Sequence, residues 1–361
     1  MNDKVTLMKG NEALAMAMIR YGADGYFGYP ITPQSEVLEK LEEEMPWETT
    51  GMVVLQAESE VAAINMVYGG AMTGKAVCTS TSSPGFSLMQ EGVSYLAASE
   101  VPALLINVQR GGPGLGTIHA SQADYFQACK GGGHGDYHMI VLAPSSVQEM
   151  ADMVALGFDL AFKYRCVSMI LADGTIGQLM EKVVLPEQRP RRTDDEIREQ
   201  CPWAVNGRKG MRPSNVVTSL ELDDDKMEEN NWRFQACYRE IEKNETRCEL
   251  IDVEDCDYLI TAFGTTARVA MKTMELARAE GIKVGMFRPI TLWPFPEKQL
   301  REAAKNVKGI LCVELNAGQM VEDVKLAVEC KMPVEHYGRF GGNVPTPDEL
   351  LNVLKEKLIN K

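Results

Sequence analysis

Residues 139–164, MIVLAPSSVQEMADMVALGFDLAFKY, indicate how this chain folds. Their first five residues form a short apolar run that ends at Ala143. Pro144 and the pattern Ser146-x-x-Glu149 follow, which is typical of a capping box at the start of a helix. Residues 150–164 then continue as an amphipathic helix. A strand that leads directly into a helix is a βα unit, and such units build parallel sheets covered by helices.

Other apolar runs alternate with helical patterns up to about residue 180. These runs cover residues 76–79, 102–108 and 167–172. The alternation predicts an α/β fold around a parallel sheet. Residues 181–250 differ, with the basic stretch PEQRPRR, the acidic stretch LELDDDKMEENN and one predicted helix over residues 232–243.

The strand and helix patterns resume at Tyr258. A helix is predicted over residues 266–280 and closed by Gly281, and the apolar segments KVGMF and GILCVEL follow. We therefore expect a domain over residues 1–180, a connector over residues 181–250 and a second, smaller α/β domain over residues 251–361.

Length and composition limit the class of protein. With 361 residues the chain is long enough for two domains, because single cores stop growing near ~250–300 residues. Lys and Arg number 37 against 51 Asp and Glu, and the net charge of -14 opposes binding to nucleic acid or anionic membranes. No apolar run approaches the ~18 residues of a membrane span, and no export signal is visible. The nine cysteines are scattered and form no CxxC pair, which indicates reduced thiols. We expect a soluble, cytoplasmic protein.

The turn GYPITP, residues 28–33, is rigid because each proline restricts itself and the residue before it. A threonine held in this way, Thr32, can present its hydroxyl to a ligand. Thr32 can equally be the N-cap of the helix predicted from Ser35, with Pro33 in its first position. The two interpretations are compatible.

Two carboxylates, Glu58 and Glu60, open a helix after the apolar run MVVL. Glu60 precedes the residues VAAI, so it enters apolar surroundings in which a carboxyl group can share or donate a proton. The alternative is that both carboxylates only complement the positive end of the helix dipole.

Arg110 follows the run at residues 102–108, at the carboxyl end of a predicted parallel strand, where open α/β sheets bind ligands. Its forked donors suit a carboxylate. The glycines at residues 111–116 match neither the dinucleotide nor the P-loop pattern. We expect no metal site at His134 and His138, because the glycines around them preclude an aligning helix. His119 is a better candidate to face a ligand.

Seven segments, in this order and spacing, resemble the alpha-type subunit of 2-oxoacid:ferredoxin oxidoreductases. They are GYPITP, QAESEVAAINMVYGGAMTGKA, TSSPGFSLMQEG, NVQRGGPGLG, GHGDYHMIVLAPSSVQE, FRPITLWPFP and VELNAGQM. The forms QAESEVAAINMVYG and RGGPGLG look most like the branched-chain 2-ketoisovalerate (3-methyl-2-oxobutanoate) subunit. The resemblance implies a pyrimidine-binding thiamine diphosphate domain over residues 1–180 and a transketolase C-terminal-like domain over residues 251–361.

The resemblance also implies residue roles. Glu60 matches the glutamate that hydrogen-bonds N1′ of the aminopyrimidine, Thr32 the threonine that contacts the 2-oxoacid, and Arg110 the arginine that clamps its carboxylate. Tyr29 and Pro30 belong to the same cofactor-binding turn. Enzymes of this family decarboxylate a 2-oxoacid on thiamine diphosphate, pass electrons through iron–sulfur clusters to ferredoxin and transfer the acyl group to coenzyme A.

Other parts of such an enzyme are missing from the sequence. It contains no GDG…N pattern for Mg²⁺ and diphosphate and no C-x₂-C-x₂-C-x₃-C run for a [4Fe–4S] cluster. The resemblance therefore implies that Mg²⁺ and the clusters lie on partner chains, namely a beta-type thiamine diphosphate subunit, a gamma-type subunit and a ferredoxin-like subunit. Thiamine diphosphate would be shared with the beta-type chain.

Alternatives remain for the function and for the late motifs. The chain could be the alpha subunit of a 2-oxoglutarate enzyme, a self-sufficient thiamine decarboxylase or transketolase-type transferase, or a non-catalytic scaffold. The loop at residues 115–119 offers apolar bulk and no second cation, which favours a branched or small acid over 2-oxoglutarate. We expect residues 288–294 to form a tight turn with a packed Trp293, and the segments FRP and VELN to form subunit contacts. Glu314 and Asn316 receive no role from the sequence.

Overall fold

The larger of two main sheets contains the four strands predicted from the apolar runs. The computed structural model describes residues 5–360, so residues 1–4 and 361 of the two predicted domains lie outside the described part. The sheet order is β12-β6-β7-β5-β4-β2-β3, with β12 antiparallel to β6 and the other strands parallel. The strands are β2 Gly25–Gly28, β3 Val53–Gln56, β4 Val77–Thr81, β5 Ala103–Gln109, β6 Ile140–Leu142, β7 Val167–Asp173 and β12 Thr291–Trp293.

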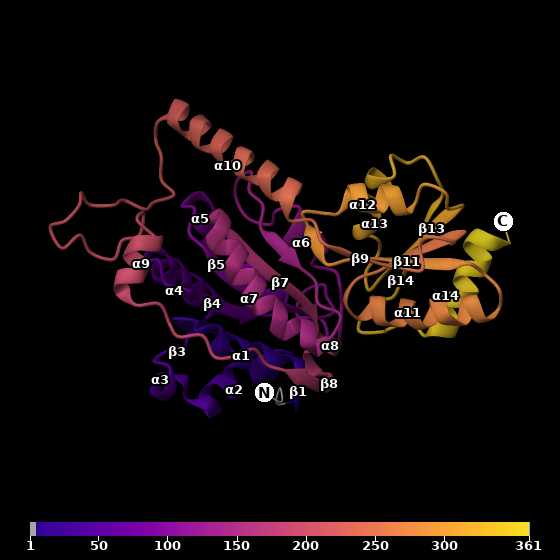
Figure 1. Cartoon of the computed structure of the whole chain (residues 1–361), viewed down its shortest axis with the longest axis horizontal. Helices are drawn as coiled ribbons and strands as arrows, with labels where there is room; N and C mark the ends of the chain where they lie inside the picture. Colours follow the sequence, from indigo (N-terminus) through magenta and orange to yellow (C-terminus); the bar gives the residue numbers. More distant parts are fainter. Residues whose placement is uncertain (1–4, 361) are drawn as a thin grey trace.

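Helices cover both faces of this sheet (Figure 1). One face carries α1 Gly10–Tyr21, α2 Ser35–Glu44 and α7 Val147–Tyr164. The other carries α4 Glu60–Met72 and α5 Pro84–Ala98. The shorter elements are α3 Pro46–Thr49, α6 Tyr125–Cys129, α8 Gly174–Gln178 and the antiparallel ribbon of β1 Val5–Lys9 with β8 Met180–Val184. Right-handed crossovers account for this division, because the chain steps along the sheet in one direction from β2 to β3 and from β6 to β7, and in the opposite direction from β3 to β4 and from β4 to β5.

The helix predicted after Ser146 is confirmed as α7, but only half of the predicted capping box is present. Ser146 Oγ accepts a hydrogen bond from Glu149 N at 3.1 Å. The Glu149 carboxylate does not return to Ser146: Oε2 accepts from Ser145 N at 2.7 Å, and Oε1 accepts from Arg288 Nη2 at 2.6 Å. Arg288 of the second sheet forms an ion pair with this carboxylate. Glu149 therefore joins the two sheets and does not complete the capping box.

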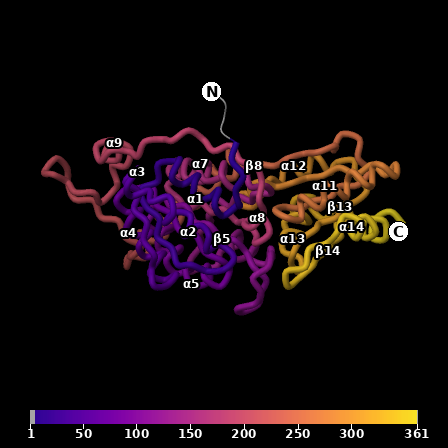
Figure 2. The backbone as a smooth tube through the Cα atoms, turned by 90° about the horizontal axis from the view of Figure 1, so that it is seen from below, coloured from indigo at the N-terminus to yellow at the C-terminus, as the bar shows by residue number. Residues whose placement is uncertain are grey.

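The connector region contains more helix than the sequence predicted. α9 Asp194–Gln200 comes first, and α10 Asp224–Asn244 begins eight residues before the predicted start at residue 232. Asp223 caps α10 by accepting from Lys226 N at 3.1 Å, which places the acidic stretch at the positive end of the helix. Between the two helices the chain projects from the body, as Figures 1 and 2 both show.

The second sheet has five strands in the order β14-β13-β10-β11-β9. They are β9 Cys248–Ile251, β10 Tyr258–Thr261, β11 Val284–Pro289, β13 Gly309–Glu314 and β14 Val334–Gly338, with only β9 antiparallel. α11 Gly264–Ala279 and α14 Pro347–Leu354 pack together, as do α12 Glu297–Ala303 and α13 Met320–Ala327, and the π-helix Lys355–Ile359 follows α14. Gly281, with φ of 81°, ends α11 as predicted.

The carboxyl ends of the two sheets meet, and buried side chains join them. Asp173, at the end of β7, accepts from Thr265 Oγ1 at 2.6 Å and from Thr265 N at 2.9 Å. Burial raises the pKa of Asp173, although these hydrogen bonds oppose the rise. The fully buried Gln122 donates to Phe263 O at 2.7 Å and accepts from Leu315 N at 3.0 Å. One amide therefore joins the ends of two strands of the second sheet to the first.

The segments FRP and VELN are buried within this chain, so their predicted role in subunit contacts is wrong, whereas Trp293 is packed as predicted. β12 extends the first sheet, and the Trp293 ring stacks on His138 at 4.6 Å between centroids. Glu314 is fully buried, and its carboxylate accepts from Met320 N at 2.8 Å and Val321 N at 3.1 Å at the start of α13. Asn316 donates to Gln122 O at 2.7 Å.

Replacing Gln122 by alanine should destabilise the chain by about 2–4 kcal/mol, because it leaves the buried Leu315 amide without a partner and removes one donor from the Phe263 carbonyl, which keeps the bond from Thr266 Oγ1. Denaturant unfolding followed by fluorescence and circular dichroism measures this change. The exposed Gln200 at the end of α9 offers a matched control, and Gln200→Ala should cost less than about 1 kcal/mol. Equal unfolding midpoints for the two variants would contradict the bridging role of Gln122.

None of the helices in residues 5–360 has the length and apolar character needed to cross a membrane.

Candidate active site where the two sheets meet

The turn after β2 places Thr32 at the carboxyl edge of the first sheet, but not as a helix cap. α2 begins at Ser35 with Gln34 as its N-cap residue, so the predicted capping role of Thr32 is wrong. The buried Gln34 accounts for the difference: its Nε2 donates to Tyr29 O at 3.3 Å and its Oε1 accepts from Ser80 Oγ at 2.5 Å. These bonds hold Gln34 in the N-cap position, and the helix begins at Ser35 as predicted. Thr32 is exposed, whereas Tyr29 is half-buried.

Pro30 and Pro33 complete this turn. Pro30 is half-buried beside Tyr29, and the Thr32–Pro33 peptide bond is cis. The Pro33 carbonyl accepts from Asn11 Nδ2 at 2.7 Å, which ties the turn to α1. Tertiary contacts therefore hold the turn in addition to the prolines themselves.

Arg110 reaches across the edge of the sheet to this turn. Its Nη1 donates to the Thr32 carbonyl at 2.8 Å, and its Nη2 donates to the Leu115 carbonyl at 3.0 Å. The side chain is 9% exposed, and its Nε has no partner in the described part of the chain. A guanidinium carries five N–H donors, so this one retains donors for an anion. The structure thus brings Thr32 and Arg110 together, as the sequence suggested.

A second layer of hydrogen bonds holds Arg110. Ser83 and Asn107 of this layer lie in the segments TSSPGFSLMQEG and NVQRGGPGLG, whereas Asp124 lies in none of the seven segments. Ser83 Oγ accepts from Arg110 N at 3.0 Å and donates to Asp124 Oδ2 at 2.6 Å. The same Oδ2 accepts from Asn107 Nδ2 at 3.0 Å. Burial raises the pKa of Asp124, although the bonds from Ser83 and Asn107 oppose the rise. Asp124 follows an irregular loop, so periodicity could not have singled it out either.

Glu60 is the first residue of α4 and is 5% exposed. Ser59 caps the helix by accepting from Ala62 N at 3.1 Å, which places Glu60 at the positive end of the helix dipole. A Cβ on Gly85 would lie 2.6 Å from Glu60 Oε1, so only glycine fits there. The neighbouring Glu58 is exposed. Both sequence interpretations of Glu60, dipole partner and buried carboxyl, therefore apply to the same residue.

The turn at the start of α5 links the two candidate groups. Ser83 holds the backbone of Arg110, and Gly85 lies against the carboxylate of Glu60. Thr81 Oγ1 and Ser82 Oγ at this turn are buried, and neither has a hydrogen-bond partner within residues 5–360. Buried hydroxyls normally find a partner, so this part of the site has unused polar groups close to Glu60.

A cavity of about 390 Å³ lies next to Arg110, between the two sheets. Its lining from the first part of the chain includes Ser83, Arg110 and Asp124, and the second part contributes Asn316 and Phe340. Arg110 is the only cation among its lining residues within the described chain. The cavity can therefore hold a small acid whose remaining groups are uncharged.

The histidines take different places. His119 is exposed, and its side chain packs against Gly342 of the second part, so it lies at the rim between the two parts. His138 stacks on Trp293, and burial lowers its pKa, while His134 is exposed. Within residues 5–360 no group of His, Cys, Asp or Glu side chains has an arrangement that would hold a metal ion.

Large apolar side chains are exposed on α4, which begins at Glu60, and on β3 and α5. The set comprises Val53 and Leu55 of the edge strand β3, Val61 and Met66 of α4, and Leu88 of α5.

Comparison with known proteins agrees with this arrangement. Residues 16–244 match the family described as pyruvate flavodoxin/ferredoxin oxidoreductase, thiamine diphosphate-binding, and residues 256–350 match core domain II of pyruvate:ferredoxin oxidoreductase. The chain is 47% identical to the ketoisovalerate oxidoreductase subunit VorB of Methanothermobacter marburgensis, over 97% of both chains. It is 35% identical to the 2-oxoglutarate synthase subunit KorA of the same organism, over 96% of this chain and 97% of that one.

Solved structures give the same result. The 2-oxoglutarate:ferredoxin oxidoreductase from Magnetococcus marinus, solved with 2-oxoglutarate, coenzyme A and succinyl-CoA bound, matches with a TM-score of 0.84 and 28% identity. The match covers 98% of this chain and 65% of that longer one. A split-gene transketolase, an inactive beta4 tetramer, matches over 98% of both chains with a TM-score of 0.60 and 13% identity, and so shares the fold. The chain belongs to the family of 2-oxoacid:ferredoxin oxidoreductase subunits.

Proposed function

We propose that this chain is the alpha-type subunit of a thiamine diphosphate-dependent 2-oxoacid:ferredoxin oxidoreductase and supplies half of its active site. One observation carries the proposal: a single turn, at the start of α5, contacts both the buried Glu60 carboxylate and the backbone of Arg110, whose guanidinium is bonded to Thr32 O. A proton-holding group and an anion-binding group thus share one edge of the sheet.

The residues present fit the aminopyrimidine half of thiamine diphosphate. Glu60 offers a buried carboxylate to a ring nitrogen, and the unpaired hydroxyls of Thr81 and Ser82 offer further polar contacts. Tyr29 and Pro30 are half-buried in the turn after β2, at the same edge of the sheet. When bound, thiamine diphosphate supplies the electron sink for decarboxylation. Glu60 holds a proton at that ring nitrogen, Arg110 binds the carboxylate of the 2-oxoacid, and Thr32 contacts the same acid.

The other half of the site would come from partner chains. Apolar side chains are exposed on α4, which begins at Glu60, and on β3 and α5, and they would contact a beta-type subunit that holds the diphosphate and Mg²⁺. A ferredoxin-like subunit would carry the iron–sulfur clusters, and a gamma-type subunit would complete the complex. For the chain itself we propose a pyrimidine-binding domain over residues 1–180, a connector over residues 181–250 and a transketolase C-terminal-like domain over residues 251–361.

We propose 2-ketoisovalerate as the substrate, converted with coenzyme A to an acyl-CoA, CO₂ and reduced ferredoxin. The cavity beside Arg110 offers no second cation for the distal carboxylate of 2-oxoglutarate and presents the Asp124 carboxylate instead. Leu115 and Ile118 supply apolar bulk at the rim, where both side chains are exposed. The 47% identity with a ketoisovalerate subunit supports the same choice.

Reconstitution with the partner chains tests this function. The complex should reduce a viologen dye with 2-ketoisovalerate and coenzyme A, with kcat/KM at least tenfold above that for 2-oxoglutarate or pyruvate. A preference for 2-oxoglutarate would overturn the substrate assignment. Turnover by the purified chain alone would instead favour a self-sufficient thiamine enzyme.

Replacing Asp124 by alanine should raise the KM of the 2-oxoacid about tenfold and change kcat less, because Ser83 and Asn107 lose the acceptor that fixes the Arg110 turn. Asp124→Asn retains an acceptor oxygen and should recover most of the affinity. Steady-state dye reduction by the complex measures both. Asp348→Ala, at the exposed start of α14, makes the same chemical change away from the cavity and should leave KM within about twofold of the parent. An unchanged KM in Asp124→Ala would contradict the positioning of Arg110 through Ser83.

A further inference from the structure

Phe340 is a large apolar side chain from the second part of the chain, and it lines the cavity beside Arg110. It lies in the loop at residues 339–343, between β14 and α14, and 58% of it is exposed. Within residues 5–360 neither another ring nor a cation stacks on it. Exposed aromatic surface inside a cavity can cover the apolar part of a ligand.

The loop that carries Phe340 is held against the segment that follows Arg110. Asn343 closes the loop by donating to Phe340 O, from its backbone N at 3.1 Å and from Nδ2 at 3.0 Å. Gly342 has a φ of 93°, and a Cβ on it would overlap the side chain of His119. None of these contacts uses the Phe340 side chain, so a substitution there should leave the loop in place.

The uncharged polar side chains that line the cavity are already hydrogen-bonded within the chain. They are Ser83, Ser87, Ser121, Asn316 and Gln319. Asn316, for example, donates from Nδ2 to Gln122 O at 2.7 Å and accepts at Oδ1 from Gly318 N at 2.7 Å. Gln319 is likewise bonded at both ends of its amide. These groups therefore have little left for a polar ligand.

Arg110 is the exception among the lining residues. Its Nε is buried without a partner, and its side chain forms no ion pair within residues 5–360. The Asp124 side chain bonds through Oδ2 alone, and its acidic group disfavours a second carboxylate on a ligand. A ligand that matches these walls has one anionic group for Arg110 and an apolar body for Phe340.

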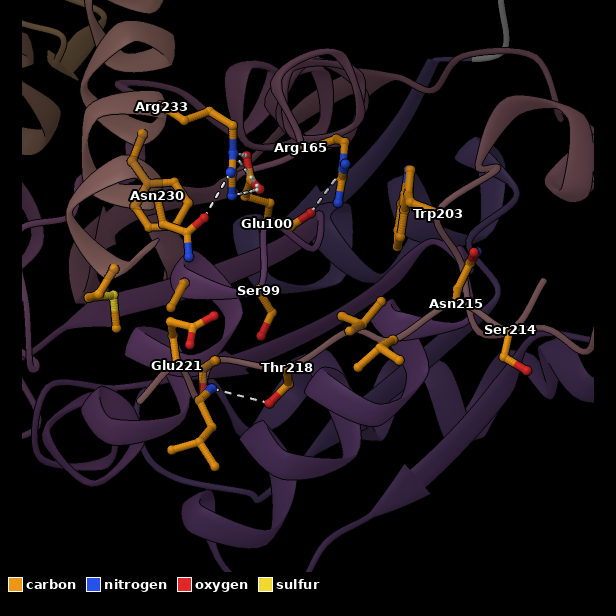
Figure 3. Close-up of a pocket in the computed structure, with 17 residues that line it drawn as sticks. Ser99, Glu100, Arg165, Trp203, Ser214, Asn215, Thr218, Glu221, Asn230 and Arg233 are labelled. Atoms are coloured by element: carbon orange, nitrogen blue, oxygen red, sulfur yellow. Dashed lines mark hydrogen bonds and ion pairs between the residues drawn. The ribbon is translucent and has the colours of Figure 1, made fainter. Parts of the chain in front are cut away.

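The cavity of about 560 Å³ that Figure 3 shows lacks this combination. Arg233 Nη2 donates to Glu100 Oε2 at 2.7 Å there, and the Arg165 guanidinium lies 4.6 Å from the ring centroid of Trp203. The cations and the ring of that cavity thus have partners within the chain. The Arg110 Nε and the Phe340 ring have none in the described part of it.

We propose that Phe340 is a specificity-determining residue for the 2-oxoacid, and that its ring packs against the carbon side chain of the acid whose carboxylate Arg110 binds. This inference rests on the proposed function. The isopropyl group of 2-ketoisovalerate covers more of the ring than the methyl group of pyruvate does, and the ring offers no partner to the distal carboxylate of 2-oxoglutarate. The smaller domain thus contributes to substrate choice, although Glu60, Thr32 and Arg110 lie in the larger one.

Substitutions of Phe340 in the assembled complex test this role. Phe340→Ala should lower the ratio of kcat/KM for 2-ketoisovalerate to kcat/KM for pyruvate about tenfold, because apolar contacts in a pocket change discrimination by this order. Phe340→Leu retains apolar bulk and should keep the ratio within about threefold of the parent. Phe340→Arg adds a cation for the distal carboxylate and should raise kcat/KM for 2-oxoglutarate about fivefold or more. Viologen reduction with coenzyme A measures all three.

Trp232 of α10 provides the matched control, because it is an aromatic side chain that is 61% exposed and lies outside the cavity. Trp232→Ala should leave the ratio of kcat/KM values within about twofold of the parent. Circular dichroism of each variant confirms that it is folded.

The outcomes separate this inference from the proposed function. A parent complex that turns over no 2-oxoacid, or that prefers another acid to 2-ketoisovalerate, contradicts the proposed function and overturns the role of Phe340 with it. In a parent complex that prefers 2-ketoisovalerate, three results overturn the role of Phe340 alone. These are a parent-like ratio in Phe340→Ala, including an equal loss for every acid, an equal change in Trp232→Ala, and an unchanged kcat/KM for 2-oxoglutarate in Phe340→Arg.

Discussion

Glu60→Gln should lower 2-oxoacid-dependent dye reduction by the assembled complex by about 10²- to 10⁴-fold, which is the usual loss when a proton-transfer group is removed. Glutamine has the same shape, so the contact with Gly85 and the start of α4 should persist. What is lost is the carboxylate that can hold a proton at a ring nitrogen. The measurement is viologen reduction with 2-ketoisovalerate and coenzyme A, together with the affinity of the complex for thiamine diphosphate, which should change much less than the rate.

Glu58 provides an unusually close control for this experiment. It lies two residues earlier in the chain, carries the same functional group and is exposed, whereas Glu60 is 5% exposed. Glu58→Gln should leave the rate within about twofold of the parent, because surface substitutions usually have small effects. If Glu60→Gln kept more than a tenth of the parent activity, Glu60 would be only a partner of the helix dipole, and the catalytic assignment would be wrong.

Arg110→Ala should raise the KM of the 2-oxoacid by about 10²-fold, because losing a buried charge-assisted contact to a carboxylate costs about 2–5 kcal/mol. Part of the loss would come from Thr32 and Leu115, whose carbonyls lose their donors. Arg110→Lys retains the charge but not the fork, and should give an intermediate KM, about tenfold above the parent. Steady-state kinetics of the complex across 2-oxoacid concentrations separates these effects from changes in kcat.

The exposed Arg239 of α10 is a suitable control, because Arg239→Ala makes the same chemical change away from the site. A complex with Arg110→Ala that kept its KM and kcat within about twofold of the parent would support a non-catalytic scaffold subunit instead.

The sequence predicted the parts of the fold that depend on local order. The apolar runs that became β4, β5, β6 and β7, the cap at Ser146 and the end of α11 at Gly281 were all visible, because strand periodicity, capping and left-handed glycine are properties of a few neighbouring residues. The family was also visible, because its motifs keep their order along the chain.

Two predictions were wrong because a residue distant in the chain forms the hydrogen bond that the local pattern assigns to a neighbour. The helix begins at Ser35 as predicted, but the buried Gln34, held by Ser80, is its N-cap residue in place of Thr32. Glu149 met the requirements of a capping box, but Arg288 of the second sheet takes its carboxylate. In each case the competing partner is remote in sequence and becomes a neighbour only when the sheets assemble.

The chain by itself determined which residues could do chemistry, and the tertiary structure decided how they act together. Glu60, Arg110 and Thr32 could be named from motifs, yet the turn that contacts both Glu60 and Arg110, and the bond from Arg110 to the Thr32 carbonyl, exist only because parallel strands bring their carboxyl ends to one edge. Asp124 could not be named at all. Its importance comes from burial and from donors on two other elements, and neither can be read from its neighbours in the chain.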